Sequence, residues 1–205
     1  RPLPEGFVHV PFNDINAIEN EIDTSTCAVI LEIIQGEGGI ILADAKYLDA
    51  VGKLCKETGT LLIIDEVQTG IGRTGKFYAY EHYGIKPDIV TIAKGLGSGV
   101  PIGAVLANDN VASAFAPGDH GSTFGGNPLS CAAALAVLKE ISKNNLIENA
   151  GQMGRMFMAG LEIISELTGK IKEIRGLGLM IGIELNECNA GNLKHKLLEK
   201  GYLVN

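Results

Sequence analysis

The sequence contains short apolar runs in which hydrophobic and polar residues do not alternate, and this feature constrains the fold more than any other. Ala28–Ile34, in which Glu32 is the one charged residue, is the first run and is interpreted as a buried strand, and Leu61–Ile64, Ile89–Ala93 and Ile102–Ala107 follow it. Continuous runs of this length are typical of strands that are covered on both faces, as in parallel sheets. Between the first two runs, Lys46–Lys56 has the apolar spacing of a helix. We therefore predict an α/β fold in which helices enclose a mainly parallel sheet.

The last third of the chain has a different pattern, in which two long helical segments are followed by short strands. The predicted elements are a helix from Pro128 to Lys143 capped by Asn127, a helix over Leu146–Leu167, strands over Ile171–Arg175 and Leu179–Leu185 around a Gly176/Gly178 bend, and a helix over Asn192–Lys200. We place a domain boundary near Asn144. It divides the chain into part of a large domain, residues 1–144, and part of a small α+β domain, residues 145–205.

The charge and hydropathy of the chain exclude several classes of function. Its 205 residues include 24 acidic and 17 basic side chains, for a net charge of −7, with no basic stripe that would bind a phosphate backbone. No apolar stretch reaches the roughly 18 residues needed to cross a membrane. We expect neither nucleic acid nor a membrane as a partner.

The cysteines indicate the redox compartment of the chain, and its first residues indicate whether it is complete. Cys27, Cys55, Cys131 and Cys188 are far apart and form no C-x-x-C pair. They fit small buried residues in a reducing, cytoplasmic compartment better than disulfides or a metal site. The chain starts at Arg1 without an initiator methionine, so we expect it to be a fragment.

Acidic residues end the second apolar run. Asp65 and Glu66 follow Leu61–Ile64, and acidic residues at this place commonly point into the crevice at the carboxyl edge of an α/β sheet. An ATPase strand that holds magnesium has the same pattern. Gly70–Lys76 also matches a phosphate-binding glycine loop, but Phe77 stands where a Ser or Thr would bind the metal. The loop also follows the acidic strand instead of preceding it, so a nucleotide site is a distant alternative.

A lysine ends the third apolar run. Lys94 follows Ile89–Ala93, and four of the next nine residues are glycines, which allow backbone and ligand to approach the amine closely. The plain alternative is a lysine that extends from the strand end into solvent. Parallel neighbouring strands would place Lys94 beside Asp65. An amine that can form a Schiff base, with a carboxylate facing a pyridinium nitrogen, is the arrangement that pyridoxal phosphate (PLP) chemistry requires.

Two further polar segments are compatible with either a ligand or an ordinary loop. Glu32 and Gln35–Gly39 close the first run, where they fit a solvated turn or a tight glycine loop near a ligand. His120–Pro128 leads into a helix, and its hydroxyls and free N–H groups suit a phosphate. On the residues alone, a capped helix start is the simpler interpretation of that second segment.

Taken together, these segments resemble the class III, or ω-type, aminotransferases of PLP fold type I. The matching stretches, in unbroken order over nearly the whole chain, are Glu32–Gly39 (EIIQGEGG), Leu61–Gly75 (LLIIDEVQTGIGRTG), Pro87–Gly103 (PDIVTIAKGLGSGVPIG), His120–Pro128 (HGSTFGGNP) and Arg175–Leu185 (RGLGLMIGIEL). One departure is Ile33, where the family usually has proline.

The resemblance implies a role for six residues, and none of them concerns a metal. It implies that Lys94 binds PLP covalently, Asp65 pairs with the pyridine nitrogen, Val67 packs on the ring, Gln68 approaches the ring hydroxyl, Thr123 reaches the cofactor phosphate of a neighbouring subunit, and Glu32 helps to position a substrate-binding arginine. The role of Thr123 implies a homodimer with shared active sites.

The implied reaction moves an amino group between N-acetylornithine, or a similar ω-amine, and 2-oxoglutarate, as in arginine biosynthesis. Enzymes for ornithine and 4-aminobutyrate share these motifs, and a non-catalytic fragment that keeps the fold and dimer surface is a further alternative. The family's phosphate cup would lie before Arg1, and its carboxylate-binding arginine after Asn205. We therefore expect the isolated chain to bind PLP weakly and not to turn over.

Overall fold

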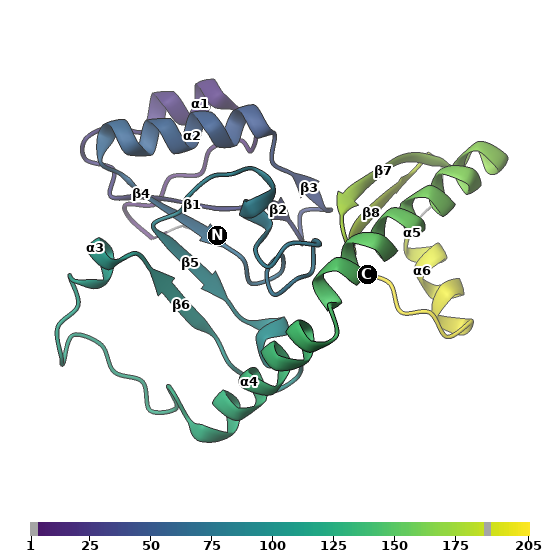
Figure 1. Ribbon diagram of the computed structural model, residues 1–205. Helices are drawn as coiled ribbons and strands as arrows, with labels where there is room; N and C mark the ends of the chain where they lie inside the picture. The colour runs from purple at the N-terminus through teal and green to yellow at the C-terminus, as the bar shows by residue number, and fades with distance from the viewer. Residues whose placement is uncertain (1–3, 187–189) are drawn as a thin grey trace.

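The computed structural model describes residues 4–186 and 190–205, so the predicted free Cys188 lies outside the described residues. A four-stranded sheet with the order β1-β4-β5-β6 forms its centre (Figure 1). Its strands are β1 (Ala28–Glu32), β4 (Leu61–Asp65), β5 (Ile89–Ile92) and β6 (Ala104–Ala107). Each corresponds to one of the apolar runs, and the predicted α/β class is confirmed.

The direction of β6 differs from that of a wholly parallel sheet. Strands β1, β4 and β5 are parallel, whereas β6 is antiparallel to β5, with Ile89 opposite Ala107. A parallel crossover needs about a dozen residues or more, usually with a helix. The connection from β5 to β6 contains only the short 3-10 helix η2 (Lys94–Leu96), so the chain turns back.

The first apolar run is not one strand. It divides at Ile33 into β1 and β2 (Ile34–Gln35), and β2 pairs in antiparallel fashion with β3 (Ile41–Leu42). The side chain of Ile33 is fully buried, so an apolar residue fills this break in the strand. The resulting turn, residues 36–40, projects beyond the carboxyl edge of β1.

Two helices cover one face of the sheet. Helix α1 (Ile15–Glu21) is capped by Asp14, whose Oδ1 accepts a hydrogen bond from Ala17 N at 3.0 Å. Helix α2 (Ala45–Thr58) ends at Gly59, whose φ of 76° is the left-handed conformation that favours glycine at a helix end. The α2 residues Leu48 and Val51 belong to the same buried cluster as Ile64.

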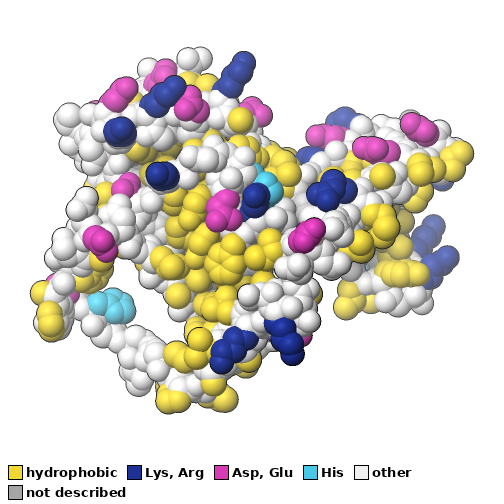
Figure 2. All heavy atoms as spheres, viewed as in Figure 1, with side chains coloured by type: hydrophobic (Ala, Val, Ile, Leu, Met, Phe, Trp, Pro, Cys, Tyr) yellow, Lys and Arg dark blue, Asp and Glu magenta, His cyan; other side chains and the backbone are white. Residues whose placement is uncertain are grey.

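The two faces of the sheet are unequally covered. Leu31, Ile64 and Val90 are neighbours in register, and all three are buried. Side chains alternate between faces along a strand, and on the other face Ile30 is 60% exposed and Val105 70% exposed. Helix cover is therefore largely limited to one face in the described part of the chain. Figure 2 shows apolar side chains gathered over the sheet between α2 and α4.

The elements after β6 begin with a short helix, α3, that was not predicted, and from α4 onward they follow the predicted order. They are α3 (Asp109–Ala112), α4 (Pro128–Lys143), α5 (Leu146–Thr168), β7 (Ile171–Leu177), β8 (Met180–Leu185) and α6 (Ala190–Glu199). Asn127 caps α4 as predicted, with its Oδ1 accepting a hydrogen bond from Ser130 N at 2.9 Å. Asn144 and Asn145 separate α4 from α5, where we placed the domain boundary, and that division stays a prediction.

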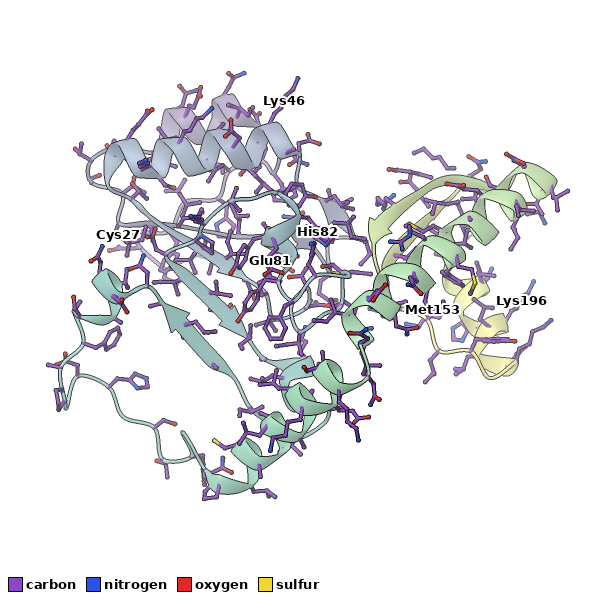
Figure 3. The ribbon with its side chains drawn as sticks, viewed as in Figure 1. Cys27, Lys46, Glu81, His82, Met153 and Lys196 are labelled. Carbon is purple, nitrogen blue, oxygen red and sulfur yellow. The ribbon has the colours of Figure 1, made fainter. Side chains whose placement is uncertain are left out.

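The described cysteines are free, but they are not equally buried. Cys55 lies in the core, where burial raises the pKa of its thiol to about 11. Cys131 is half-buried. Cys27 is exposed beside the start of β1 (Figure 3), so the prediction of burial is wrong for this residue, which precedes the covered part of the strand. No helix among the described residues is long and apolar enough to span a membrane.

Candidate active site

Polar side chains from three neighbouring strands form one row at the carboxyl edge of the sheet. Glu32 in β1 is in register with Asp65 in β4, which is in register with Thr91 in β5. Residues in register on adjacent strands lie on the same face, and this row belongs to the less covered face that carries Ile30. A site built on this row is therefore open on that side in the described chain.

Asp65 is held by two hydrogen bonds to a single oxygen. Its Oδ1 accepts from Val67 N at 2.9 Å and from Thr91 Oγ1 at 3.0 Å. Its Oδ2 receives no hydrogen bond from the described residues. The carboxylate is thus fixed in direction, with one oxygen left available for a ligand donor.

Lys94 follows the end of β5 in a strained backbone conformation. Its φ is +40°, which is uncommon for a residue with a side chain and is often found at functional sites. The residue is exposed, and its amine has no hydrogen bond or ion pair with any described residue. The structure therefore places Asp65 and Lys94 at the carboxyl ends of two adjacent parallel strands, but the described chain does not bury the amine.

The electrostatics of Glu32 connect these two charges. Burial raises the pKa of Glu32, and the hydrogen bond from Gly36 N at 3.3 Å opposes that rise. The Asp65 charge raises this pKa further, while the Lys94 charge lowers it. Both charges act on one half-buried carboxyl group, so the three ionisable side chains share one small region.

Val67 and Gln68 lie in the turn after β4, and the turn at residues 36–40 faces them. Gln68 Nε2 donates to Glu37 Oε1 at 3.2 Å. A Cβ added at Gly36 would lie 2.8 Å from the Gln68 amide, so a larger residue there would displace this flexible side chain from its present position. The structure brings Glu37 into the site, although a solvated turn is an equally good interpretation of its sequence position.

A cleft of about 950 Å³ runs beside these residues. It is lined by Gly36, Glu37, Val67, Gln68, Lys94 and Ser98, together with residues of α4, α5 and β8. Four of the six described non-glycine residues with positive φ also line it, namely Ile40, Ile71, Lys94 and Ser98. Because positive φ is a genuine outlier for a β-branched residue, backbone strain is concentrated at this cleft.

Thr123 is not close to the other candidates in the described chain. It is exposed, and it lies in the irregular segment between α3 and α4 that runs away from the sheet (Figure 1). It is not among the described residues that line the cleft. A contribution of Thr123 to a neighbouring subunit stays a prediction.

Glu66 has a structural position that differs from that of Asp65 beside it. It is 1% exposed, and burial raises its pKa. Its Oε1 accepts from Tyr80 N at 3.0 Å, and its Oε2 accepts from Thr69 Oγ1. Glu66 thereby ties the turn after β4 to η1 (Ala79–His82), where Figure 3 shows Glu81 and His82. Asp65 and Glu66 are equivalent in their sequence pattern, and only the folded structure distinguishes the half-buried carboxylate from the buried one.

The glycine loop at residues 70–76 serves helix packing. A Cβ at Gly72 would lie 3.0 Å from Ile147, and one at Gly75 would lie 3.0 Å from the backbone of Gly151, both in α5. No helix starts at Lys76, as a phosphate-binding loop would require. The nucleotide alternative therefore loses its structural basis.

Comparisons with known proteins agree with this geometry. The family model for "Aminotransferase class-III" matches residues 7–205. The chain belongs to the class III aminotransferase family. It is 53% identical over 204 residues to the acetylornithine aminotransferase of Caldanaerobacter subterraneus subsp. tengcongensis. The matched region spans 100% of this chain and 52% of that relative.

Solved structures of the family also match. The acetylornithine aminotransferase of Elizabethkingia anophelis has a TM-score of 0.89 and 42% identity, over 97% of this chain and 51% of that one. The ornithine aminotransferase of Toxoplasma gondii, with partial occupancy of PLP at its active site, has a TM-score of 0.92 and 39% identity. That match covers 100% of this chain and 49% of the Toxoplasma chain. The chain thus spans about half the length of the relatives it matches, and the fold is PLP fold type I.

The residues present fit the ring portion of PLP, the cofactor of this family. The available oxygen of Asp65 suits a ring nitrogen, the unpaired amine of Lys94 suits covalent attachment, and the Gln68 amide suits a ring hydroxyl. The close approach permitted by Gly36 keeps Gln68 at the edge of the cleft. Among the described residues lining the cleft, however, no cluster of hydroxyl and N–H donors is dedicated to the phosphate.

Proposed function

We propose that this chain carries the ring-binding half of a PLP-dependent aminotransferase site. The observation that carries the proposal is the placement of Asp65 as the last residue of β4 and of Lys94 two residues after the end of the adjacent parallel strand β5, at one edge of the sheet. In this proposal Lys94 binds the cofactor covalently, Asp65 pairs with its ring nitrogen, Val67 packs on the ring and Gln68 contacts the ring hydroxyl. Glu32 helps to position a group that binds the substrate.

The contributions of the side chains follow from their charges. PLP supplies an electron-withdrawing ring that stabilises negative charge on the substrate carbon. The Asp65 carboxylate raises the pKa of the ring nitrogen, because an opposite charge favours its protonated form. Thr91 and Val67 hold that carboxylate in place through its other oxygen. The Lys94 amine acts as general base and acid, taking a proton from the substrate and returning it.

For the complete protein we propose transamination between N-acetylornithine and 2-oxoglutarate, in arginine biosynthesis. The support is the identity of about 50% with several acetylornithine aminotransferases. Ornithine is a second candidate substrate, because several of the matching solved structures are ornithine aminotransferases at 38–41% identity. A kinetic comparison of the two amines, made on the complete protein, distinguishes these possibilities.

We also propose that the complete protein is a homodimer in the cytoplasm. The segment between α3 and α4 that carries Thr123 runs away from the sheet, and Thr123 is exposed and does not line the cleft, which is compatible with a contact to the cofactor phosphate in a second subunit. A non-catalytic role of the isolated chain as a folded dimer component is the alternative. Dimer formation without any bound cofactor would favour that alternative.

The isolated chain should bind PLP weakly and should not turn over. Lys94 is exposed, and the polar row of Glu32, Asp65 and Thr91 lies on the open face of the sheet. Water therefore competes with every polar contact that the ring would make.

Borohydride reduction of the chain with PLP, followed by peptide mapping, tests the proposal. We expect one dominant pyridoxyl label, on Lys94, saturating only at high PLP concentration and absent in Lys94→Ala. Labels spread evenly over surface lysines, with no change in Lys94→Ala, would refute covalent attachment at this residue. Tight binding together with transaminase activity would refute the expected weakness of the isolated chain.

A further inference from the structure

Arg175 starts the motif Arg175–Leu185, and the chemistry proposed above gives it no role. It lies in β7, and its side chain reaches the turn at residues 36–40, more than 130 positions earlier in the sequence. Its Nε donates to Gly39 O at 3.0 Å and Ile40 O at 3.1 Å, and its Nη2 donates to Gly39 O at 2.8 Å. A guanidinium is suited to this task because its donors form a rigid fork.

Two carboxylates fix the direction of this fork. Nη1 of Arg175 donates to Glu173 Oε2 at 2.9 Å and to Glu184 Oε2 at 3.2 Å. The Arg175 side chain is only 19% exposed, so these charge-assisted bonds are partly shielded from water. The orientation of Arg175 is therefore set within the β7–β8 hairpin, independently of the turn that it contacts.

The turn that Arg175 holds is connected to two of the proposed site residues. Gly39 N donates to Gly36 O at 3.2 Å, which closes the turn. At its start, Gly36 N donates to Glu32 Oε2 at 3.3 Å. At its tip, Glu37 Oε1 accepts from Gln68 Nε2 at 3.2 Å. Movement of this turn would change the surroundings of both Glu32 and Gln68.

The turn has an unfavourable conformation that needs external support. Ile40 has a φ of +58°, which is costly for a β-branched residue, and Gly39 has a φ of +103°. A Cβ added at Gly182 in β8 would lie 2.9 Å from Ile40 Cβ, so the hairpin backbone packs directly on the turn. Arg175 and Gly182 are opposite each other in the hairpin, and both contact the turn at residues 36–40.

We propose that Arg175 is a positioning residue, whose guanidinium holds the turn at residues 36–40 in the conformation that orients Glu32 and Gln68. The relevance of that orientation to a cofactor rests on the proposed function. The contact between Arg175 and the turn, and its effect on Glu32, can be tested without any cofactor.

The experiment compares three variants of this chain by hydrogen exchange and by NMR titration of carboxyl groups. Arg175→Met removes the guanidinium and keeps much of the stem, whereas Arg175→Lys keeps the charge without the fork. Lys172→Met is the matched control, because Lys172 also lies in β7 and also bonds Glu184 but has no contact with the turn. Thermal unfolding verifies that each variant is folded. If Arg175→Met does not fold, the comparison is made with Arg175→Lys alone.

In Arg175→Met we expect the amides of Gly36, Gly39 and Ile40 to exchange ~10-fold faster or more, since several charge-assisted bonds are lost. Arg175→Lys should be intermediate, and Lys172→Met should match the unmodified chain. The pKa of Glu32 should rise in Arg175→Met, because the Gly36 N–H no longer stabilises its charged form. Asp65 and Lys94 also act on Glu32, and both lie outside the turn, so their charges are unchanged in these variants. Glu37 also raises this pKa and lies in the turn, but its effect is the smallest of these, so loss of the Gly36 hydrogen bond should outweigh any movement of Glu37.

Unchanged exchange in both Arg175 variants, or an equal change in Lys172→Met, would overturn the proposal. Faster exchange without any change in the pKa of Glu32 would overturn it as well, since Arg175 would then act only on the stability of the turn. PLP trapping at Lys94 is measured in parallel. Its absence from every chain counts against the proposed function, while the turn amides and Glu32 still decide the role of Arg175.

Discussion

The two faces of the central sheet are built from alternate residues of the same strands, yet they differ in packing and in function. On one face Leu62 and Ile64 are buried beneath α2. On the other, Ile30 is mostly exposed, and the row of Glu32, Asp65 and Thr91 crosses the carboxyl end. The covered face supplies the stability of this chain. The open face presents the polar groups of the proposed site, and their exposure explains why we expect weak cofactor binding.

The largest expected difference between the faces is in core stability. Ile64→Ala should reduce the free energy of unfolding by about 3 kcal/mol, because it leaves a cavity in a fully buried position. Ile30→Ala removes the same atoms from a residue that is 60% exposed, and it should cost less than about 1 kcal/mol. Urea unfolding of both variants measures the two values. Equal losses would show that the open face is covered in solution.

Two adjacent carboxylates provide the next comparison. Glu66→Ala should destabilise the chain by about 2 kcal/mol, because Tyr80 N and Thr69 Oγ1 lose their buried acceptor. Asp65→Ala should cost about 1 kcal/mol or less, since Asp65 is half-buried, but it should abolish PLP trapping at Lys94. Unfolding and borohydride trapping, measured on both variants, separate the structural acid from the proposed functional one. If Glu66→Ala instead abolished trapping while Asp65→Ala destabilised the fold more, Glu66 would be the functional acid and Asp65 the structural one.

The smallest expected effect is the pH dependence that Glu66 contributes. Burial raises the pKa of Glu66 in the folded state above its value in the unfolded state. At pH values between these two pKa values, the folded chain therefore holds the proton more tightly than the unfolded chain does. The stability contributed by this group is therefore highest below the unfolded pKa, and it falls as the pH rises through the folded pKa. The difference in unfolding free energy between the unmodified chain and Glu66→Gln should show this fall. A difference that rises with pH instead would mean that the hydrogen bonds to Glu66 outweigh its burial.

The strands of the fold, and the location of Asp65 and Lys94 at the carboxyl ends of neighbouring strands, could be predicted from the sequence. Largely apolar runs located β1, β4, β5 and β6, because strands that are covered on both faces are rich in hydrophobic residues. The same continuity hides which residues face which side, so the open face could not be anticipated. The direction of β6 depends on how the chain turns after Lys94, which local pattern does not determine.

Other parts of the site depend on contacts between distant residues. Arg175 and the turn at residues 36–40 are joined only in the folded structure. Thr91 is a hydroxyl within the apolar strand Ile89–Ile92, and this exception to the pattern was a signal that could have identified it. The burial of Glu66 had no such signal, because two consecutive acids look equivalent in sequence.

A crystal structure of the chain after borohydride reduction with PLP tests the central claim most directly. We expect the ring to be attached to Lys94 Nζ, with its pyridine nitrogen within about 3.2 Å of Asp65 Oδ2, the normal range of a hydrogen bond. A ring attached to Lys94 whose nitrogen faces solvent, or a ring attached to a different lysine, would contradict the account.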